Sequence, residues 1–211
     1  MMTLPDALAA SPLIAILRGL EPARAAETAE VLVEAGFRAI EVPLNSPSAL
    51  VSIERISQRV GGKALIGAGT VLTAAEMHSV ADAGGRIIVA PNMNPALGAA
   101  TVARGLAWCP GVMTPSEAFA ALEIGAGVLK LFPAEMIPPK VVAALRAVLP
   151  REALVAAVGG ITPDGMAAYR DAGCDAFGLG SALFKPSYSR KDIAERAKRF
   201  VAMSAELRPR Q

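Results

Sequence analysis

The stretch GVLKLFP, residues 127 to 133, is an apolar run with one charged side chain, Lys130. A short apolar run bounded by glycine and proline is typical of a buried strand. A lysine is rarely buried without a partner or a chemical task, because removing water from an ammonium group is costly. Both the strand and its lysine therefore need an explanation from the rest of the chain.

Seven similar runs recur along the chain, each followed by a turn of Gly, Pro, Ser or Thr and then by an alanine-rich helical stretch. Their starts lie about 20 to 27 residues apart, the length of one strand, turn and crossover helix. The eight runs are LIAIL (from Leu13), RAIEV (Arg38), ALIGAG (Ala64), RIIVA (Arg86), GLAWC (Gly105), GVLKLF (Gly127), LVAAV (Leu154) and AFGLG (Ala176).

This alternation predicts a parallel sheet whose strands are covered by helices. An open doubly wound sheet usually has five or six strands, whereas eight near-equal units can close on themselves. We therefore predict an α/β fold, a (β/α)8 TIM barrel forming a single domain over residues 1–211. Glycines in AGF (35–37), AGG (83–85) and AGC (172–174) mark helix ends. The leading TLPDALAAS should form a short helix that caps the bottom of the barrel.

Composition excludes several classes of protein. The chain is 53% hydrophobic, yet its apolar segments fall short of the roughly 20 unbroken residues that a membrane-spanning helix needs. The N-terminus lacks the basic flank of a signal peptide, so we expect a cytoplasmic protein with no membrane partner. The net charge is +2 and the basic residues are scattered, so no nucleic acid partner is expected.

The cysteines and the histidine predict little chemistry. Cys109 and Cys174 lie in apolar surroundings and form no disulfide framework. His78 is the one histidine of the chain; it falls in a helical stretch, where we expect a surface residue and no zinc site of several imidazoles. The alternating charges between Arg190 and Arg208 predict the solvated face of a last helix.

Polar residues that close the predicted strands are the candidates for catalysis, because the active site of a barrel lies at the C-terminal ends of its strands. These residues are Arg18, Glu41, Thr70 and Lys130. Side chains alternate along a strand, so Lys130 should point into the barrel, as should Val128 and Phe132, while Leu129 and Leu131 face the helices.

The lysine can be read in two ways. An apolar cavity lowers the pKa of a lysine, and a neutral amine can attack a carbonyl to form a Schiff base, with Glu41 as the group that relays protons. Alternatively, Lys130 and Glu41 form a structural ion pair, or Glu41 pairs with Arg18. We favour the catalytic reading, because Lys130 is the lysine placed at the end of a strand.

Two glycine loops follow the last two strands, AVGGITPDG (157–165) and GLGSALF (178–184). Barrels often bind phosphate between these two loops, through glycine N–H groups and a helix N-terminus. Thr162 before Pro163 resembles an N-cap, which would start a helix near the glycines. A plain tight turn would explain one Gly-Gly pair, but two loops at these positions favour phosphate.

Several motifs together are highly specific, and they cover nearly the whole chain. They are LIAILRG (13–19), IEVPLNSP (40–47), IGAGTVL (66–72), APN (90–92), CPGVMTPSEAF (109–119), LKLFPA (129–134), VGGITP (158–163) and GLGSALF (178–184). By these motifs the chain resembles the 2-keto-3-deoxy-phosphosugar aldolases. These class I, Schiff-base barrels cleave six-carbon 2-keto acid phosphates to pyruvate and glyceraldehyde 3-phosphate.

Two places resemble the phosphogalactonate branch of that family. Phosphogluconate-type members generally have a threonine or an arginine-bearing turn after the glutamate, and a threonine just before Gly-Gly. This chain has residues 43–46, PLNS, in the first place and Val158 in the second. A lost hydroxyl changes which C4 epimer can be hydrogen-bonded. The resemblance thus implies cleavage of 2-dehydro-3-deoxy-6-phospho-D-galactonate, with the phosphogluconate epimer as the alternative.

The resemblance also implies roles for individual residues, no metal or cofactor, and a homotrimer. Lys130 would be the Schiff-base nucleophile and Glu41 the proton shuttle. Substrate contacts would come from Arg18 and Thr70 at the keto-acid carboxylate, from Val158, and from Gly159, Gly160, Gly180 and Ser181 at the phosphate. The family's arginine after the glutamate is absent, with Asn45 near its place, which leaves a helix dipole and backbone donors to balance the phosphate charge.

Two other functions are compatible with a phosphate-binding barrel. A phosphosugar epimerase or decarboxylase would use paired acids or a metal, and acids are few at the predicted strand ends. A non-catalytic phosphosugar-binding barrel would form no covalent adduct, which would leave Lys130 without a task.

Overall fold

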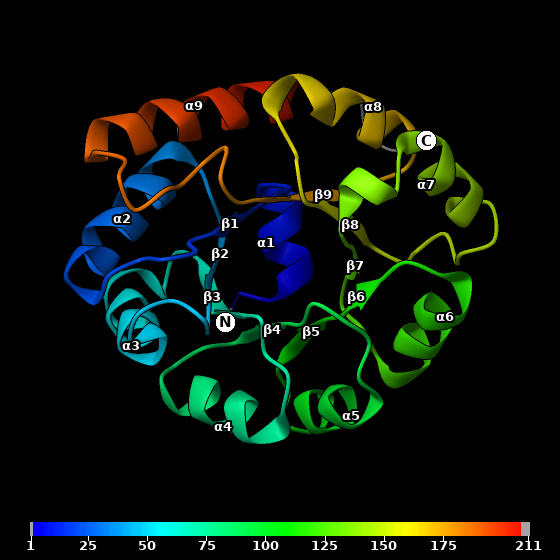
Figure 1. Ribbon diagram of the computed structural model, residues 1–211, viewed down its shortest axis with the longest axis horizontal. Coiled ribbons are helices and arrows are strands. Elements are labelled where there is room, and N and C mark those ends of the chain that lie inside the picture. Colours follow the sequence, from blue (N-terminus) through cyan, green and yellow to red (C-terminus); the bar gives the residue numbers. More distant parts are fainter. Residues whose placement is uncertain (1, 208–211) are drawn as a thin grey trace.

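The structure, a computed structural model that describes residues 2–207, is a barrel of parallel strands inside a ring of helices (Figure 1). The strands are β1 (Leu13–Ile16), β2 (Ala39–Pro43), β3 (Leu65–Gly69), β4 (Ile87–Val89), β5 (Ala107–Cys109), β6 (Gly111–Val112), β7 (Leu129–Leu131), β8 (Val155–Val158) and β9 (Ala176–Leu179). The α-helices are α1 (Leu4–Ala10), α2 (Pro22–Ala35), α3 (Ala49–Val60), α4 (Ala74–Asp82), α5 (Pro95–Ala103), α6 (Pro115–Ile124), α7 (Pro139–Arg146), α8 (Met166–Asp171) and α9 (Arg190–Glu206). Two short 3-10 helices are η1 (Ala134–Met136) and η2 (Pro163–Gly165). The predicted (β/α)8 barrel is confirmed.

The fifth barrel strand is broken in two, which explains why nine strands occupy eight positions. The strand order is β5-β4-β3-β2-β1-β9-β8-β7-β6, so the two ends of the sheet are consecutive in sequence. Pro110 separates β5 from β6, and proline has no N–H for a sheet. The barrel closes where the Gly127 amide donates to the Trp108 carbonyl and the Lys130 amide donates to the Pro110 carbonyl, each at 2.9 Å.

Two apolar clusters fill the molecule, one on each face of the strands. Leu129 and Leu131 belong to the larger cluster, between the strands and the outer helices. Val128 belongs to the smaller one inside the barrel, which Phe132 joins as a half-buried neighbour. The alternation predicted along GVLKLF is therefore confirmed, since β-strand side chains point to opposite faces.

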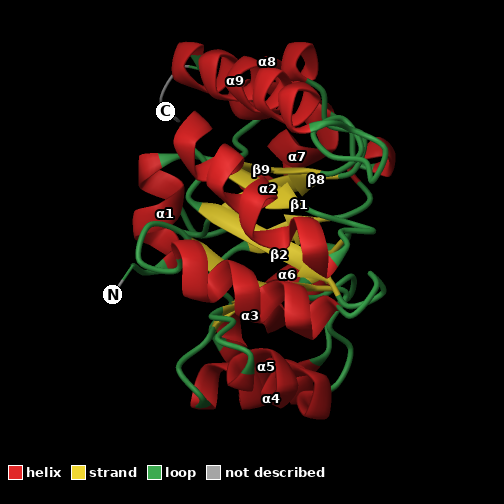
Figure 2. Ribbon diagram, turned by 90° about the vertical axis from the view of Figure 1, so that its left-hand side faces the viewer, coloured by secondary structure: helices red, strands yellow, loops and turns green. Residues whose placement is uncertain are grey.

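Helix α1 closes one end of the barrel, as predicted from TLPDALAAS. Thr3 begins the helix through a capping box with Asp6, a pairing that satisfies two backbone N–H groups. Leu4 and Leu8 are buried and join the cluster inside the barrel. Figure 2 shows α1 at one end of the barrel and a group of loops at the opposite end.

The predicted helix ends also lie where the glycines placed them. Gly36, Gly84 and Gly173 follow α2, α4 and α8 with φ of +121°, +87° and +106°, a region that favours glycine. The last helix is α9, which ends at Glu206, and Arg208 lies outside the described residues.

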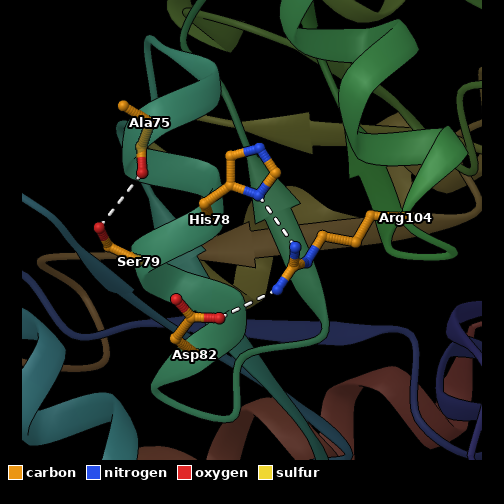
Figure 3. A network of polar contacts seen from close by, with 5 residues as sticks. All are labelled: Ala75, His78, Ser79, Asp82 and Arg104. Atoms are coloured by element: carbon orange, nitrogen blue, oxygen red, sulfur yellow. Dashed lines mark hydrogen bonds and ion pairs between the residues drawn. The ribbon is translucent and has the colours of Figure 1, made fainter.

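His78 is exposed on α4 (Figure 3), a helix of the outer ring (Figure 1). Its Nδ1 accepts a hydrogen bond of 3.1 Å from Arg104, which also pairs with Asp82 at 2.9 Å. The predicted surface position is confirmed. Over residues 2–207, no cluster of three or more His, Cys, Asp or Glu side chains is arranged to hold a metal ion. No helix in the same range is long and apolar enough to span a bilayer.

Candidate active site

A cavity of about 920 Å³ opens at the C-terminal ends of the strands. It lies at the barrel end opposite α1, where the loops gather in Figure 2. The structure brings all nine predicted site residues to its wall. They are Arg18, Glu41, Thr70, Lys130, Val158, Gly159, Gly160, Gly180 and Ser181.

Lys130 points from β7 into the barrel and is 8% exposed. Its Nζ lies 3.4 Å from the Ala90 carbonyl oxygen, to which it donates a hydrogen bond, and 4.4 Å from the centre of the Phe132 ring. Burial lowers the pKa of Lys130 because the ammonium is desolvated, while the negative charge of Glu41 opposes that shift. An amine that loses its proton more easily than usual can act as a nucleophile.

Glu41 is the second buried charged residue, 2% exposed on β2. Burial raises its pKa to about 7, and the positive charges of Lys130 and Arg18 limit the rise. Its Oε2 has no hydrogen-bond partner among the described residues. A carboxyl group with a pKa near 7 can both take and give a proton at neutral pH.

Neither structural ion pair considered for these residues is formed. No ion pair within residues 2–207 includes Glu41 or Lys130. Arg18 instead donates from Nη1 to the side-chain oxygen of Asn45 at 2.6 Å. The next residue, Gly19, donates its amide to the Ser46 hydroxyl at 3.0 Å. The loop after β2 therefore fixes the position of Arg18 beside the cavity.

Thr70 follows β3 and has an unusual backbone. Its φ is +57°, in the left-handed region that β-branched residues rarely adopt. Strained residues of this kind are concentrated at functional sites. Thr70 and Arg18 border the same cavity from the ends of β3 and β1, the two strands that flank β2.

The two glycine loops lie together on another part of the cavity wall. Gly159 and Gly160 have φ of +112° and +63°, so their successive amides turn sharply. Thr162 accepts from the Gly165 amide at 3.3 Å, as predicted for an N-cap, but the turn it begins is the single-turn helix η2. The α-helix expected here is α8, which begins at Met166, so it starts farther from the glycines than predicted.

Comparison with known proteins identifies the family. The family described as "KDPG and KHG aldolase" matches residues 5–199. The chain belongs to this aldolase family. Its members include a protein from Escherichia coli (strain K12) named "2-dehydro-3-deoxy-6-phosphogalactonate aldolase", 46% identical over 190 residues, which cover 90% of this chain and 93% of that one.

A second relative and a solved structure show the same similarity to this aldolase family. A protein from Rhizobium meliloti (strain 1021) named "Probable 2-dehydro-3-deoxy-6-phosphogalactonate aldolase" is 48% identical over 88% of each chain. The solved structure described as "Native KDPGal structure" has a TM-score of 0.91 at 45% identity and covers 92% of this chain and 95% of that one. The chain is thus an aldolase, a carbon–carbon lyase with the barrel fold.

Four further residues of this aldolase, which sequence reasoning missed, border the cavity. Lys185 and Tyr188 lie in the loop after β9, Arg196 lies on α9, and Glu135 lies in η1. Lys185 thus borders the cavity from a loop, whereas Lys130 borders it from strand β7. Loop and helix positions carry no strand-end signal, and only the folded chain brings them to the cavity.

Cys109 is buried in apolar surroundings, as predicted. It lies inside the barrel below the cavity, in a group that includes Glu41 and Lys130. Burial raises the pKa of its thiol to about 12, so it remains a neutral apolar neighbour of the lysine. Its sequence signal was its place at the end of the run GLAWC.

Proposed function

We propose that the chain is a class I aldolase that cleaves 2-dehydro-3-deoxy-6-phospho-D-galactonate to pyruvate and D-glyceraldehyde 3-phosphate through a Schiff base on Lys130. One observation carries this proposal. A buried lysine with a lowered pKa faces a cavity beside Glu41, the other charged side chain that is buried among residues 2–207. Desolvation keeps the amine nucleophilic, and the cavity admits a six-carbon substrate.

The bond changes balance with groups that this chain supplies. The Lys130 amine attacks the C2 carbonyl of the substrate, and loss of water from the carbinolamine leaves an iminium. Loss of the C4 hydroxyl proton then breaks the C3–C4 bond and releases D-glyceraldehyde 3-phosphate. The electron pair of the broken bond moves into the iminium to give an enamine. C3 of the enamine takes up a proton, and water releases pyruvate and restores the amine. These steps need no metal and no diffusible cofactor.

Glu41 is proposed to move the protons. As a carboxylate it accepts the C4 hydroxyl proton, and as a carboxylic acid it returns a proton to C3 of the enamine. A pKa of about 7 suits both directions. Its Oε2 supports this role, because that oxygen has no hydrogen-bond partner among residues 2–207 and is free to accept the proton.

The two ends of the substrate are proposed to bind on different sides of Lys130. The Arg18 guanidinium and Thr70 would bind the keto-acid carboxylate, since a guanidinium suits a planar anion. The phosphate would lie in the cradle of backbone amides and the Ser181 hydroxyl. The cradle consists of Gly159, Gly160, Gly180 and Ser181.

Reductive trapping tests the Schiff base. We expect incubation with pyruvate and borohydride to add one reduced pyruvate per chain, at Lys130 in peptide mapping. Lys130→Arg should abolish both the adduct and cleavage, whereas Lys140→Arg, at an exposed position on α7, should change neither. The absence of an adduct, or an adduct on another lysine, would refute the aldolase mechanism and favour a non-catalytic phosphosugar-binding barrel.

The galactonate substrate is supported by the two relatives named for it and by Val158 beside the cradle. The alternative is the phosphogluconate epimer at C4, cleaved by the same chemistry. Comparing kcat/KM for the two epimers decides between them. A preference for the gluconate epimer in the wild-type protein would overturn the assignment.

We propose also that residues 1–211 form one domain, act in the cytoplasm and assemble as a homotrimer. Exposed apolar side chains such as Leu72, Met113 and Phe119 support an assembly, because large apolar groups gain from burial. Sedimentation should give the mass of three chains. A monomer at micromolar concentration would contradict the trimer without affecting the proposed chemistry.

A further inference from the structure

The proposed phosphate cradle lacks a positive charge of its own. Gly159, Gly160 and Gly180 offer backbone groups, and Ser181 offers a neutral hydroxyl. Glu135 adds a negative charge nearby, because its carboxylate lies against the Gly159–Gly160 turn, where a side chain on either glycine would overlap it. A phosphate dianion held here needs a cation to balance both charges.

Two cations border this part of the cavity, and neither forms an ion pair with an acidic side chain of the described residues. Lys185 lies four residues after Ser181, and Arg196 reaches the same loop from α9. The ion pairs of residues 2–207 include neither side chain. Asp192, one turn before Arg196, accepts hydrogen bonds from Ser189 as part of the cap of α9.

The position of Arg196 is fixed by two contacts. Its Nη1 donates to the Ala182 carbonyl at 3.0 Å, so the guanidinium lies next to the residue that follows Ser181. Its Cζ lies 4.3 Å from the centre of the Tyr188 ring. The bond to Ala182 uses one of five guanidinium N–H groups, and a guanidinium suits two oxygens of a phosphate.

Tyr188 also contacts Lys185, whose Nζ lies 5.7 Å from the ring centre. The same loop is held from the other side by Arg24, which donates to the Pro186 carbonyl at 2.6 Å. The loop after β9 therefore presents both cations to the cavity without first having to fold, which reduces the ordering cost of binding an anion.

We propose that Lys185 and Arg196 bind the phosphate of the substrate and balance its charge, with Tyr188 holding the two cations in place. This inference rests on the proposed function, since it concerns the phosphate end of the same substrate. The turn after Glu41 provides no positive charge for the phosphate. In this proposal the charge comes instead from the loop after β9 and from α9.

The aldol direction gives a test with an internal control, because the aldehyde can be offered with or without its phosphate. We expect Lys185→Gln with Arg196→Gln to lower kcat/KM for D-glyceraldehyde 3-phosphate about ten- to a hundredfold, mainly through KM. The value for unphosphorylated D-glyceraldehyde should stay within about twofold, as should pyruvate trapping at Lys130. Lys198→Gln, an exposed lysine on α9 that does not border the cavity, should change none of these values.

The outcomes separate the two proposals. If the wild-type protein neither traps pyruvate nor makes an aldol product, the proposed function fails. If the wild-type protein is active and the double variant keeps its preference for the phosphorylated aldehyde, this inference alone fails. An equal loss with both aldehydes would indicate a structural role and would also overturn it. Lys185→Arg with Arg196→Lys should recover most of the phosphate preference, because both charges are kept.

Discussion

The carboxylate of Glu41 lies directly against Gly69, at the end of the neighbouring strand β3, so closely that any side chain at position 69 would overlap it. The glycine leaves room for a buried acid between two strands. The position of the proposed proton shuttle thus depends on a residue that has no functional group.

Gly69→Ala should displace the Glu41 carboxylate and slow proton transfer. We expect exchange of the pyruvate methyl protons in D2O, followed by NMR, to fall at least about tenfold, while borohydride trapping at Lys130 persists. Gly62→Ala is a suitable control, since no atom lies within 4 Å of the position that its methyl group would take. In a Glu41→Gln background, Gly69→Ala should lower the rate of proton exchange little further, because both changes act through one carboxylate. If the rate losses of the two single variants multiply fully in the double variant, Gly69 does not act through the Glu41 carboxylate.

The pKa of Glu41 predicts an acid limb in the pH profile. If the carboxylate is the base for the C4 hydroxyl, kcat/KM for cleavage should rise with pH through about 7. Glu41→Gln should lower kcat about 10²- to 10⁴-fold and remove this limb. An unchanged limb in the variant would assign it to another group.

The same carboxyl group should make stability depend on pH. Its pKa is raised from 4.5 to about 7 in the folded protein, so the folded state holds a proton that the unfolded state releases between those values. The free energy of unfolding should therefore fall as pH rises from about 4.5 to 7. Glu41→Gln should weaken this fall in unfolding free energy and stabilise the protein at pH 8 by about 1–3 kcal/mol. Urea denaturation at about pH 4.5 and at pH 8 measures both effects.

The bond between Arg18 and Asn45 predicts an effect on the carboxylate end of the substrate. Asn45→Ala should free the guanidinium and raise KM for pyruvate about three- to tenfold, with a smaller effect on kcat. Gln58→Ala, which removes an exposed side-chain amide bonded to Glu54, should leave KM unchanged. A larger loss in kcat than in KM would place Arg18 in the chemical step instead.

Val158 should influence the choice between C4 epimers. Val158→Thr puts a hydroxyl at the cavity wall and should shift the ratio of kcat/KM toward the phosphogluconate epimer by about tenfold. Val158→Ala removes volume without adding a donor, and should lower both rates without shifting the ratio. A shift of equal size in both variants would show that shape, rather than the hydroxyl, selects the epimer.

Much of the site could be predicted from the sequence because barrel topology places strand ends together. Glu41 and Lys130 are far apart in the chain, yet each closes an apolar run, and the closure of eight units brings the ends of these runs to one cavity. The glycine loops were found by the same rule, since they follow the last two strands.

The missed features depend on contacts across the fold. Arg196 lies in a charged helix that indicates a solvated face, and nothing local reveals that its guanidinium reaches the loop after β9. The break at Pro110 divides a run that otherwise predicts one strand. The contact between Gly69 and Glu41 requires knowledge of how β2 and β3 align, which a single sequence does not provide.

The short helix at the base of the barrel has a consequence for the lysine at the top. The apolar column that starts at Leu4 and Leu8 continues through the barrel to Cys109 and Val158. It insulates the amine from beneath, so solvent approaches through the mouth. A polar residue at Leu8 should let water rise along the column and increase the proton affinity of an amine at the far end of the molecule. The first ten residues would then influence the protonation of Lys130 without contacting the substrate.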